Sequence, residues 1–221
     1  MSDRKFDLIL FDLDGTLFNT KWTILEALDG FVKYKGLKKL TEEELESFFG
    51  PPAAISFKKY FNDISDKERE ELLYEYRNYY MENTLLKAKP YDGTEDVLKE
   101  LKNRGFKIAL ATYKLMRCVT PLIEHYGYNK YFDSIKGSVA ELGSTKTQIM
   151  KDAISECKIS DNNRICMIGD TEHDFGGARN LEVAFIGMNY AGNFDTLTDE
   201  QKNYKKFVGI CNKAIEILDK V

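Results

Sequence analysis

Residues 6–16, FDLILFDLDGT, decide the fold: a short apolar run leads directly into two aspartates and a Gly-Thr turn. A run of this length next to turn residues is typical of a buried strand. Similar runs follow at 106–111, 132–136, 164–168 and 183–188. Segments with helical periodicity follow at 93–104, 116–127, 145–157 and 174–181, and a last helix is expected at 209–219. This alternation predicts an α/β fold with a parallel sheet flanked by helices.

Residues 17–88 interrupt the alternation, because they contain no convincing strand and resemble several amphipathic helices in succession. The sequence therefore predicts an α/β core domain made of residues 1–16 and 89–221, with an inserted all-helical domain of residues 17–88 between its two parts.

Helix boundaries within this insertion are also predicted. Thr41 with Glu44, and Ser65 with Glu68, each fit a capping box, in which side chain and backbone satisfy each other's free amides. Gly50-Pro51-Pro52 should separate two helices, because proline lacks an amide donor and disfavours helical geometry in the residue before it.

Composition limits the classes of protein to consider. Hydrophobic residues make up 43% and charged residues 31% of the 221 residues, which is typical of a compact globular chain. The net charge of −4 argues against a nucleic-acid partner. No stretch approaches the length of a membrane span or signal peptide, so we expect no membrane association and a cytoplasmic location. The four cysteines are widely spaced, without a CxxC pair, and are interpreted as reduced thiols.

Asp12 and Asp14 follow directly on the first apolar run, so their carboxylates should project from the carboxyl end of a strand. Open α/β sheets bind ligands at that edge. An ordinary strand-to-turn aspartate pair is the alternative, since Asp and Gly are common in turns.

A second acidic stretch, GDTEHD at residues 169–174, comes directly after another predicted strand. If the two strands are neighbours, four carboxylates meet at one edge of the sheet: Asp12, Asp14, Asp170 and Asp174. Such a cluster requires a cation, and Mg²⁺ suits oxygen ligands of this kind. Asp174 could instead be a helix N-cap.

Two further polar residues have suitable positions for binding phosphate. Thr112 ends the run FKIALAT, and Lys146 opens a helical segment after Gly143-Ser144-Thr145. A hydroxyl can donate to a phosphoryl oxygen, and an ammonium can neutralise charge shared by a nucleophile and a transferred group. Each residue alone is weak evidence, because a threonine at a strand end and a lysine at a helix start are common.

FDLDGTL, the strand-ending Thr112, Lys146 and GDTEHD occur in the order of the four motifs of haloacid dehalogenase superfamily hydrolases, which the chain resembles. PYDGTEDVLKEL at 90–101, YFDSIKGS at 131–138 and GDTEHDFGGARN at 169–180 are similar to phosphoglycolate phosphatase-like members. The likeness covers essentially the whole chain. It implies that the core is Rossmann-like and that the insertion is a helical C1-type cap domain.

The resemblance also implies roles in a phosphatase reaction. Asp12 is expected to be the nucleophile that forms an aspartyl-phosphate, and Asp14 the general acid and then the general base. Thr112 and Lys146 would hold the phosphoryl oxygens, together with backbone amides of Leu13, Asp14 and Tyr113. The expected ligands of Mg²⁺ are Asp12, the backbone carbonyl of Asp14, and Asp170, with Asp174 in or just behind the metal shell.

Two departures from the family pattern stand out. An acidic residue and a serine or threonine often follow the first motif, whereas Phe18-Asn19-Thr20-Lys21 stands here. The lysine motif often continues with proline, whereas Thr147 and Gln148 follow Lys146.

Other functions on related scaffolds remain as alternatives. A true dehalogenase would need neither Mg²⁺ nor Asp14. A phosphosugar mutase of the beta-phosphoglucomutase type would share all the core residues, and a non-catalytic phosphate-binding regulatory module is a third possibility. A phosphoacceptor domain of the response-regulator kind would lack the helical insertion.

The expected partner is a small phosphorylated metabolite, such as phosphoglycolate, a nucleotide or a sugar phosphate, bound by a monomer or homodimer. Candidates for selecting it are Lys21, Trp22, Lys58, Lys59 and a loop at Gly50-Pro51-Pro52. Each has a plain alternative: lysines are usually solvated, and the only tryptophan could pack inside the inserted domain.

Overall fold

The computed structural model describes residues 4–49, 51, 53–139 and 144–221, which form two compact units. The core unit comprises the described residues up to Phe18 together with Pro90–Val221, and the helical unit is Asn19–Lys89. None of the described helices is both long enough and apolar enough to cross a membrane.

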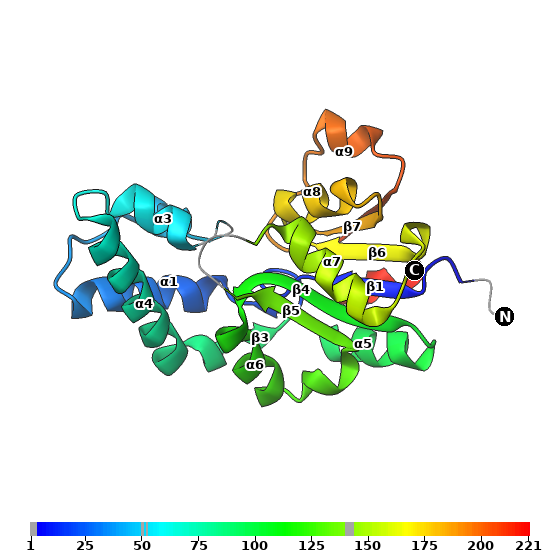
Figure 1. The fold of residues 1–221 in the computed structure, drawn as a ribbon, viewed down its shortest axis with the longest axis horizontal. Coiled ribbons are helices and arrows are strands. Elements are labelled where there is room, and N and C mark those ends of the chain that lie inside the picture. Colours follow the sequence, from blue (N-terminus) through cyan, green and yellow to red (C-terminus); the bar gives the residue numbers. More distant parts are fainter. Residues whose placement is uncertain (1–3, 50, 52, 140–143) are drawn as a thin grey trace. The chain divides into compact units, whose positions relative to one another are not determined.

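Among the described residues, six parallel strands form the sheet of the core unit, in the order β5-β4-β1-β6-β7-β8 (Figure 1). They are β1 (Leu8–Phe11), β4 (Lys107–Leu115), β5 (Ser134–Ser138), β6 (Ile165–Gly169), β7 (Ala184–Met188) and β8 (Phe207–Cys211). Every residue of β1, β6 and β7 is buried, which is why these strands are apolar throughout and do not alternate. All five predicted strands are confirmed.

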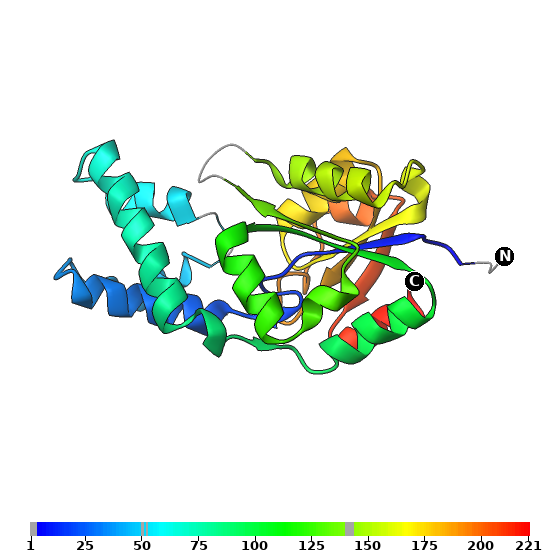
Figure 2. The ribbon, with the colours of Figure 1, turned by 60° about the horizontal axis from the view of Figure 1, so that its bottom comes forward.

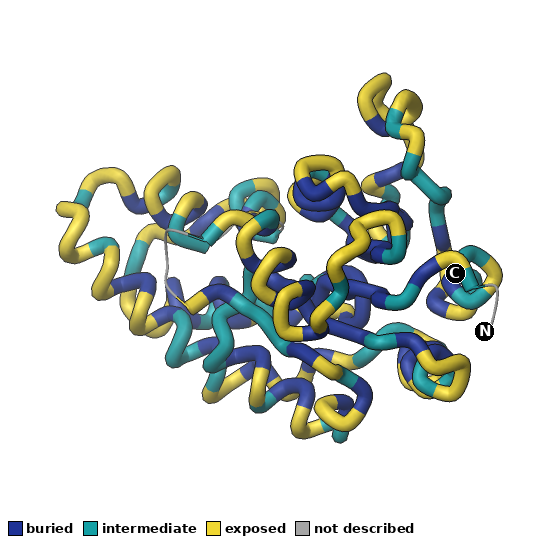
Figure 3. Tube along the Cα trace, turned by 45° about the vertical axis from the view of Figure 1, so that its right-hand side comes forward, coloured by how far each residue is buried: buried dark blue, intermediate teal, exposed yellow. Residues whose placement is uncertain are grey.

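Helices cover both faces of this sheet. The helices α7 (Lys146–Cys157) and α8 (Glu172–Asn180) lie on one face, and α5 (Thr94–Asn103) and α6 (Met116–His125) lie on the other (Figure 2). In Figure 3 these helices alternate between buried and exposed residues, as expected of helices with one face on a sheet. Shorter elements complete the unit: η2 (Tyr128–Tyr131), η3 (Asn162–Arg164) and α9 (Asp199–Asn203). The predicted α/β fold class is confirmed.

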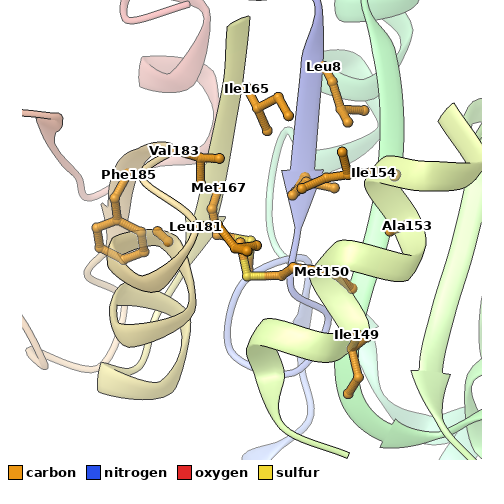
Figure 4. Close-up of a cluster of buried hydrophobic side chains, with 14 of the residues drawn as sticks. Leu8, Ile149, Met150, Ala153, Ile154, Ile165, Met167, Leu181, Val183 and Phe185 are labelled. Atoms are coloured by element: carbon orange, nitrogen blue, oxygen red, sulfur yellow. The ribbon is translucent and has the colours of Figure 1, made fainter. Parts of the chain in front are cut away.

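The main apolar core lies between the sheet and the pair α7 and α8. Leu8 and Met167 of the strands meet Met150 and Ile154 of α7, and Phe185 of β7 closes the cluster (Figure 4). Each of the five side chains is at most 9% exposed. Because α7 and α8 are fixed on this core, the residues at their amino ends have defined positions over the sheet.

The prediction of a last helix at 209–219 is wrong. The chain there forms β8, followed by the short 3-10 helix η4 (Ala214–Asp219). Strand β8 pairs with β7, and its register shifts at Gly209, whose φ of +150° no helix can accommodate. Pairing with β7 satisfies backbone groups that would otherwise form an open sheet edge, and this outweighs the helical pattern.

The helical unit consists of α1 (Lys21–Tyr34), α2 (Glu42–Glu46), α3 (Ala53–Tyr60), α4 (Asp66–Asn83) and the 3-10 turn η1 (Leu85–Lys87). Its core is aromatic: the ring of Tyr76 lies 5.8 Å from that of Phe31 and 5.3 Å from that of Phe57. Trp22 keeps 42% of its surface exposed, so it is not a core residue of this unit.

Both predicted capping boxes are confirmed. Thr41 caps α2 with Glu44, and Ser65 caps α4 with Glu68. The chain leaves α2 at Glu46 and enters α3 at Ala53, as the proline pair between them requires; Gly50 and Pro52 themselves lie outside the described residues.

Two very short strands, β2 (Phe18–Asn19) and β3 (Lys89–Pro90), form a two-stranded sheet where the chain leaves and re-enters the core unit. The expectation that residues 17–88 contain no strand is therefore wrong at their beginning. A pairing of two residues is too short to leave an apolar pattern in the sequence.

Candidate active site

The strand order brings the predicted site residues to one edge of the sheet. Strand β1 lies between β4 and β6, with Phe11 paired to Leu110 on one side and to Ile168 on the other. Asp12, Thr112 and Asp170 follow these paired residues directly or two positions later. Asp12 and Asp170 therefore lie just beyond the carboxyl ends of β1 and β6, at the edge where doubly wound sheets bind ligands. Thr112 lies inside β4, which continues to Leu115, so the expectation that Thr112 ends its strand is wrong.

Three carboxylates form the centre of this edge. Asp12, Asp170 and Asp174 each have one carboxylate oxygen that lies within 4.8 Å of the corresponding oxygens of the other two. Their residues are only 6%, 2% and 1% exposed. The predicted cluster is thus present for these three aspartates, whereas the side chain of Asp14 is not part of it.

Two glycines make this close approach possible. A Cβ atom on Gly15 would lie 2.1 Å from Asp170 Oδ2, and the φ of +79° at this position is itself unfavourable for other residues. A Cβ on Gly169 would lie 2.3 Å from Asp174 Cγ. Glycine is therefore required at both strand ends for the carboxylates to reach the centre.

Lys146 provides the positive charge at this centre. It is the first residue of α7, is 3% exposed, and its Nζ lies 2.5 Å from Asp12 Oδ1. Nζ also lies 2.6 Å from Asp174 Oδ1, but without hydrogen-bond geometry, and that oxygen has no hydrogen-bond partner among the described residues. The helix start is held by Thr145, whose side chain accepts from the amide of Gln148.

Burial and charge shift the pKa values of the cluster. Burial raises the pKa of Asp12 to about 7 despite the opposing attraction of Lys146, with the charges of Asp174 and Asp14 adding to the rise. Burial and the charge of Asp174 raise the pKa of Asp170 well above its ordinary value. The pKa of Lys146 is raised, because the attraction of Asp12 and Asp174 exceeds the opposing effect of burial.

These residues fit a metal ion. Three buried carboxylates face one buried ammonium, which leaves excess negative charge in a place from which water is largely excluded. The Oδ1 of Asp174 lies beside the Lys146 ammonium but accepts no hydrogen bond among the described residues, so it can serve as an oxygen ligand. An all-oxygen set of donors suits a hard divalent cation.

Asp174 has a second task at the start of α8. Its Oδ2 accepts from the backbone N–H and the hydroxyl of Thr171, at 3.0 and 2.7 Å, while the Thr171 hydroxyl accepts from the Asp174 amide. The N-cap is therefore Thr171, and the alternative of Asp174 as the N-cap is wrong. The capping box fixes one carboxylate oxygen and aims the other at the cluster.

Asp170 is held by two residues to which the sequence analysis assigned no role. The hydroxyl of Thr16 donates to Asp170 Oδ1 at 3.0 Å, and the Asn193 side chain donates to the Asp170 carbonyl at 2.8 Å. Thr16 belongs to the FDLDGTL motif and could have been found there. Asn193 lies in a loop after β7 with no pattern of its own.

The turn after β1 presents backbone donors. The carbonyl of Leu13 accepts from the amides of Thr16, Leu17 and Phe18, which folds residues 13–18 tightly on themselves. No hydrogen bond among the described residues uses the amides of Leu13 or Asp14.

Thr112 and Tyr113 are both tied to other site residues. Thr112 is 1% exposed, and its hydroxyl accepts from the amide of Lys114 at 3.2 Å. The Tyr113 hydroxyl accepts from the amide of Lys146 at 2.9 Å, so the side chain of Tyr113 helps to seat α7. The rings of Tyr113 and His173 are perpendicular to each other, with centroids 5.4 Å apart.

Asp14 pairs with a lysine that the sequence analysis missed. The Nζ of Lys114 lies 3.1 Å from each oxygen of the Asp14 carboxylate, and the Lys114 side chain is only 6% exposed. The one available signal was its position two residues after Thr112 in the same strand.

Comparison with known proteins agrees with this architecture. Residues 9–188 match the model of the haloacid dehalogenase-like hydrolase family. The chain belongs to this family. The resemblance inferred from the four motifs is thereby confirmed, as is the expected enzyme class, a phosphoglycolate phosphatase-like hydrolase.

Individual relatives cover most of the chain. A phosphoglycolate phosphatase of Aquifex aeolicus is 30% identical over 76% of this chain and 77% of its own length. A 5'-nucleotidase of Pseudomonas aeruginosa is 28% identical over 90% of each chain, and a pyrophosphatase of Halalkalibacterium halodurans 30% over 85% of each. The crystal structure of a predicted phosphatase from Clostridium acetobutylicum superposes with a TM-score of 0.81 over 98% of each chain at 30% identity.

Proposed function

We propose that the protein is a Mg²⁺-dependent phosphatase that hydrolyses a small phosphomonoester through an aspartyl-phosphate on Asp12. The observation that carries this proposal is the buried group of Asp12, Asp170 and Asp174 around the ammonium of Lys146. No ordinary structural need accounts for three buried carboxylates at a ligand-binding edge, since each costs free energy unless it is paired.

Asp12 is the proposed nucleophile. One of its oxygens is hydrogen-bonded to Lys146, which leaves the other to attack phosphorus as the bond to the leaving oxygen breaks. The Lys146 ammonium lies where it can neutralise charge shared by Asp12 and the transferred phosphoryl group. Asp12, Asp170, Asp174 and the Asp14 carbonyl would hold Mg²⁺, which when bound would supply charge neutralisation for the phosphoryl oxygens.

Asp14 is the proposed acid and base. It lies two residues after Asp12 and outside the three-carboxylate cluster, so its side chain is not committed to a metal. In the first half of the reaction it gives a proton to the leaving oxygen. In the second half it takes a proton from the water that attacks the aspartyl-phosphate, which releases phosphate and restores Asp12.

Groups for binding the phosphoryl oxygens surround the same edge. The unengaged amides of Leu13 and Asp14 support their proposed role as donors, and the buried hydroxyl of Thr112 and the amide of Tyr113 complete the set. Such fixed donors cost no reorganisation as charge develops on the phosphoryl group.

The proposed substrate class is a small phosphate ester or anhydride. The relatives named above act on phosphoglycolate, nucleotides and pyrophosphate, and we propose a substrate among these or among the sugar phosphates. We also propose that the helical unit serves as a cap, because it is inserted directly after the first acidic turn. A cytoplasmic location and a monomeric or dimeric state stay predictions.

Phosphate release tests the proposed reaction. Wild type should release inorganic phosphate from at least one compound of a panel containing phosphoglycolate, nucleoside monophosphates, sugar phosphates and pyrophosphate. Activity should disappear with EDTA and return with Mg²⁺. Asp12→Asn should abolish it, whereas Asp152→Asn, at an exposed position of α7, should leave it unchanged.

The intermediate can be trapped in the same experiment. Acid quenching during turnover of ³²P-labelled substrate should leave label on wild type, removable by hydroxylamine, and none on Asp12→Asn. Transfer of phosphate to another sugar position without release would point to a mutase. Release of phosphate by Asp12→Asn at the wild-type rate would refute the proposed mechanism.

A further inference from the structure

Lys114 connects two residues of the proposed reaction. Its backbone N–H donates to the hydroxyl of Thr112 at 3.2 Å, and its Nζ donates to both carboxylate oxygens of Asp14 at 3.1 Å. The side chain of Lys114 is 6% exposed and that of Asp14 is 24% exposed. A lysine almost never becomes this buried without a partner, so the contact is a built feature of the site.

The end of β4 explains how the lysine reaches Asp14. The pairing of β4 with β5 is regular up to Ala111 and resumes at Leu115 with a shifted register. An irregularity of this kind at a strand end re-aims the side chains that it contains. Thr112 and Lys114 lie within it, and from there the Lys114 side chain reaches Asp14.

The two buried lysines have separate carboxylate partners. Lys146 contacts Asp12 and Asp174, and Lys114 contacts Asp14. Nζ lies 3.1 Å from both oxygens of Asp14, so the carboxylate points at the ammonium, which restrains its place and its direction.

We propose that Lys114 is a positioning residue, which holds the Asp14 carboxylate in the orientation needed for its two proton transfers. This inference rests on the proposed function, in which Asp14 is the acid and base. Proton transfer is sensitive to the distance and direction between the partners, and a displacement of about 1 Å can reduce a rate by about 100-fold. Loss of Lys114 should therefore impair proton transfer and leave attack by Asp12 intact.

A kinetic experiment separates these two steps. With 2,4-dinitrophenyl phosphate the leaving group departs without protonation, so the burst of dinitrophenolate reports attack by Asp12, and the later steady state reports hydrolysis of the intermediate. Lys114→Met should keep the burst rate but lower the steady-state rate by about 10- to 100-fold. With an alkyl phosphate such as phosphoglycolate, formation of the intermediate should slow as well, and KM should change little.

A double-mutant cycle tests whether Lys114 acts through Asp14. If it does, Lys114→Met should add little to the loss already caused by Asp14→Asn, because the group being positioned is gone. Lys114→Arg, which keeps a donor and a positive charge, should recover part of the rate. Lys136→Met is the matched control, because this lysine of β5 pairs with Glu156, and it should behave as wild type.

Two results would overturn the inference. A rise in KM at unchanged kcat, or a loss that multiplies with that of Asp14→Asn, would make Lys114 a substrate contact. A crystal structure of Lys114→Met with Asp14 in its original orientation would exclude positioning without any assay. The proposed function fails in a different way: wild type would then release no phosphate, or Asp14→Asn would remain fully active.

Discussion

Lys146→Met removes the ammonium between two buried carboxylates and keeps a side chain of similar shape at the start of α7. Lys146 is 3% exposed, and its Nζ lies 2.5 Å from Asp12 and 2.6 Å from Asp174. Removing one partner of a buried ion pair costs about 3–5 kcal/mol, because the remaining charge stays buried without compensation. For a chain of this size, that corresponds to a decrease in Tm of about 6–20 °C.

Thermal unfolding in EDTA measures this effect, with Lys151→Met as the control. Lys151 is an exposed lysine of the same helix, so its replacement should change Tm little. Added Mg²⁺ should restore much of the stability of Lys146→Met, since a ligand at 100 times its Kd contributes about 2.7 kcal/mol. Phosphate release should still fall by about 100- to 1,000-fold, the usual cost of one lost electrostatic contact in the transition state. A Lys146→Met protein with the Tm of Lys151→Met in EDTA would refute the assignment of a buried, charge-balancing role.

Two further predictions concern the framework around the site. Gly15→Ala should lower Tm and raise the Mg²⁺ concentration needed for activity, because its Cβ would lie 2.1 Å from Asp170 Oδ2. Gly127→Ala is the control: Gly127 has a similar positive φ with open space around it, so its replacement should lower only the free energy of unfolding, by about 1–2 kcal/mol of strain. Asp7→Asn tests a pH dependence. Hydrogen bonds from Arg164 lower the pKa of Asp7 in the folded protein, despite some burial. The carboxylate therefore contributes stability at pH values above its ordinary pKa, and this contribution is lost as the pH falls through the lowered pKa of the folded state. Urea unfolding should show wild type more stable than Asp7→Asn by at most about 1 kcal/mol at pH 7, because the pair is partly exposed, with the difference shrinking at pH 3; a difference that grows in acid would contradict this sign.

The parts of the fold that depend on neighbouring residues could be predicted from the sequence. The capping boxes at Thr41 and Ser65 involve partners three residues away, and the buried strands of the sheet are continuous apolar runs. The cluster of Asp12, Asp170 and Asp174 was also predictable, because it needs only that two strands with acidic ends be adjacent. Acidic residues at two strand ends carry that information in the sequence itself.

The parts that depend on distant pairing could not be predicted in the same way. The segment from Phe207 to Asp219 has enough apolar residues for a helix, and only the open edge of β7 decides that its first half becomes a strand. Asn193 supports the Asp170 carbonyl from a loop whose position depends on the packing of Phe194 against Gly187. Neither contact leaves a periodic pattern, because each partner is chosen by the assembled sheet.

Lys114 shows why the lysines of the site were harder to predict than its carboxylates. It is one of 32 basic residues, and its pairing with Asp14 depends on the register shift at the end of β4, which no local pattern reports. The shift divides the charged groups of the site into two sets, with Lys146 serving Asp12 and Asp174, and Lys114 serving Asp14. Neither lysine can replace the other, because each ammonium is buried against its own partners and would have to give them up to move. The proposed nucleophile and the proposed proton carrier, only two residues apart in the chain, are thus held by cations from two different elements, which allows each carboxylate a fixed and separate orientation.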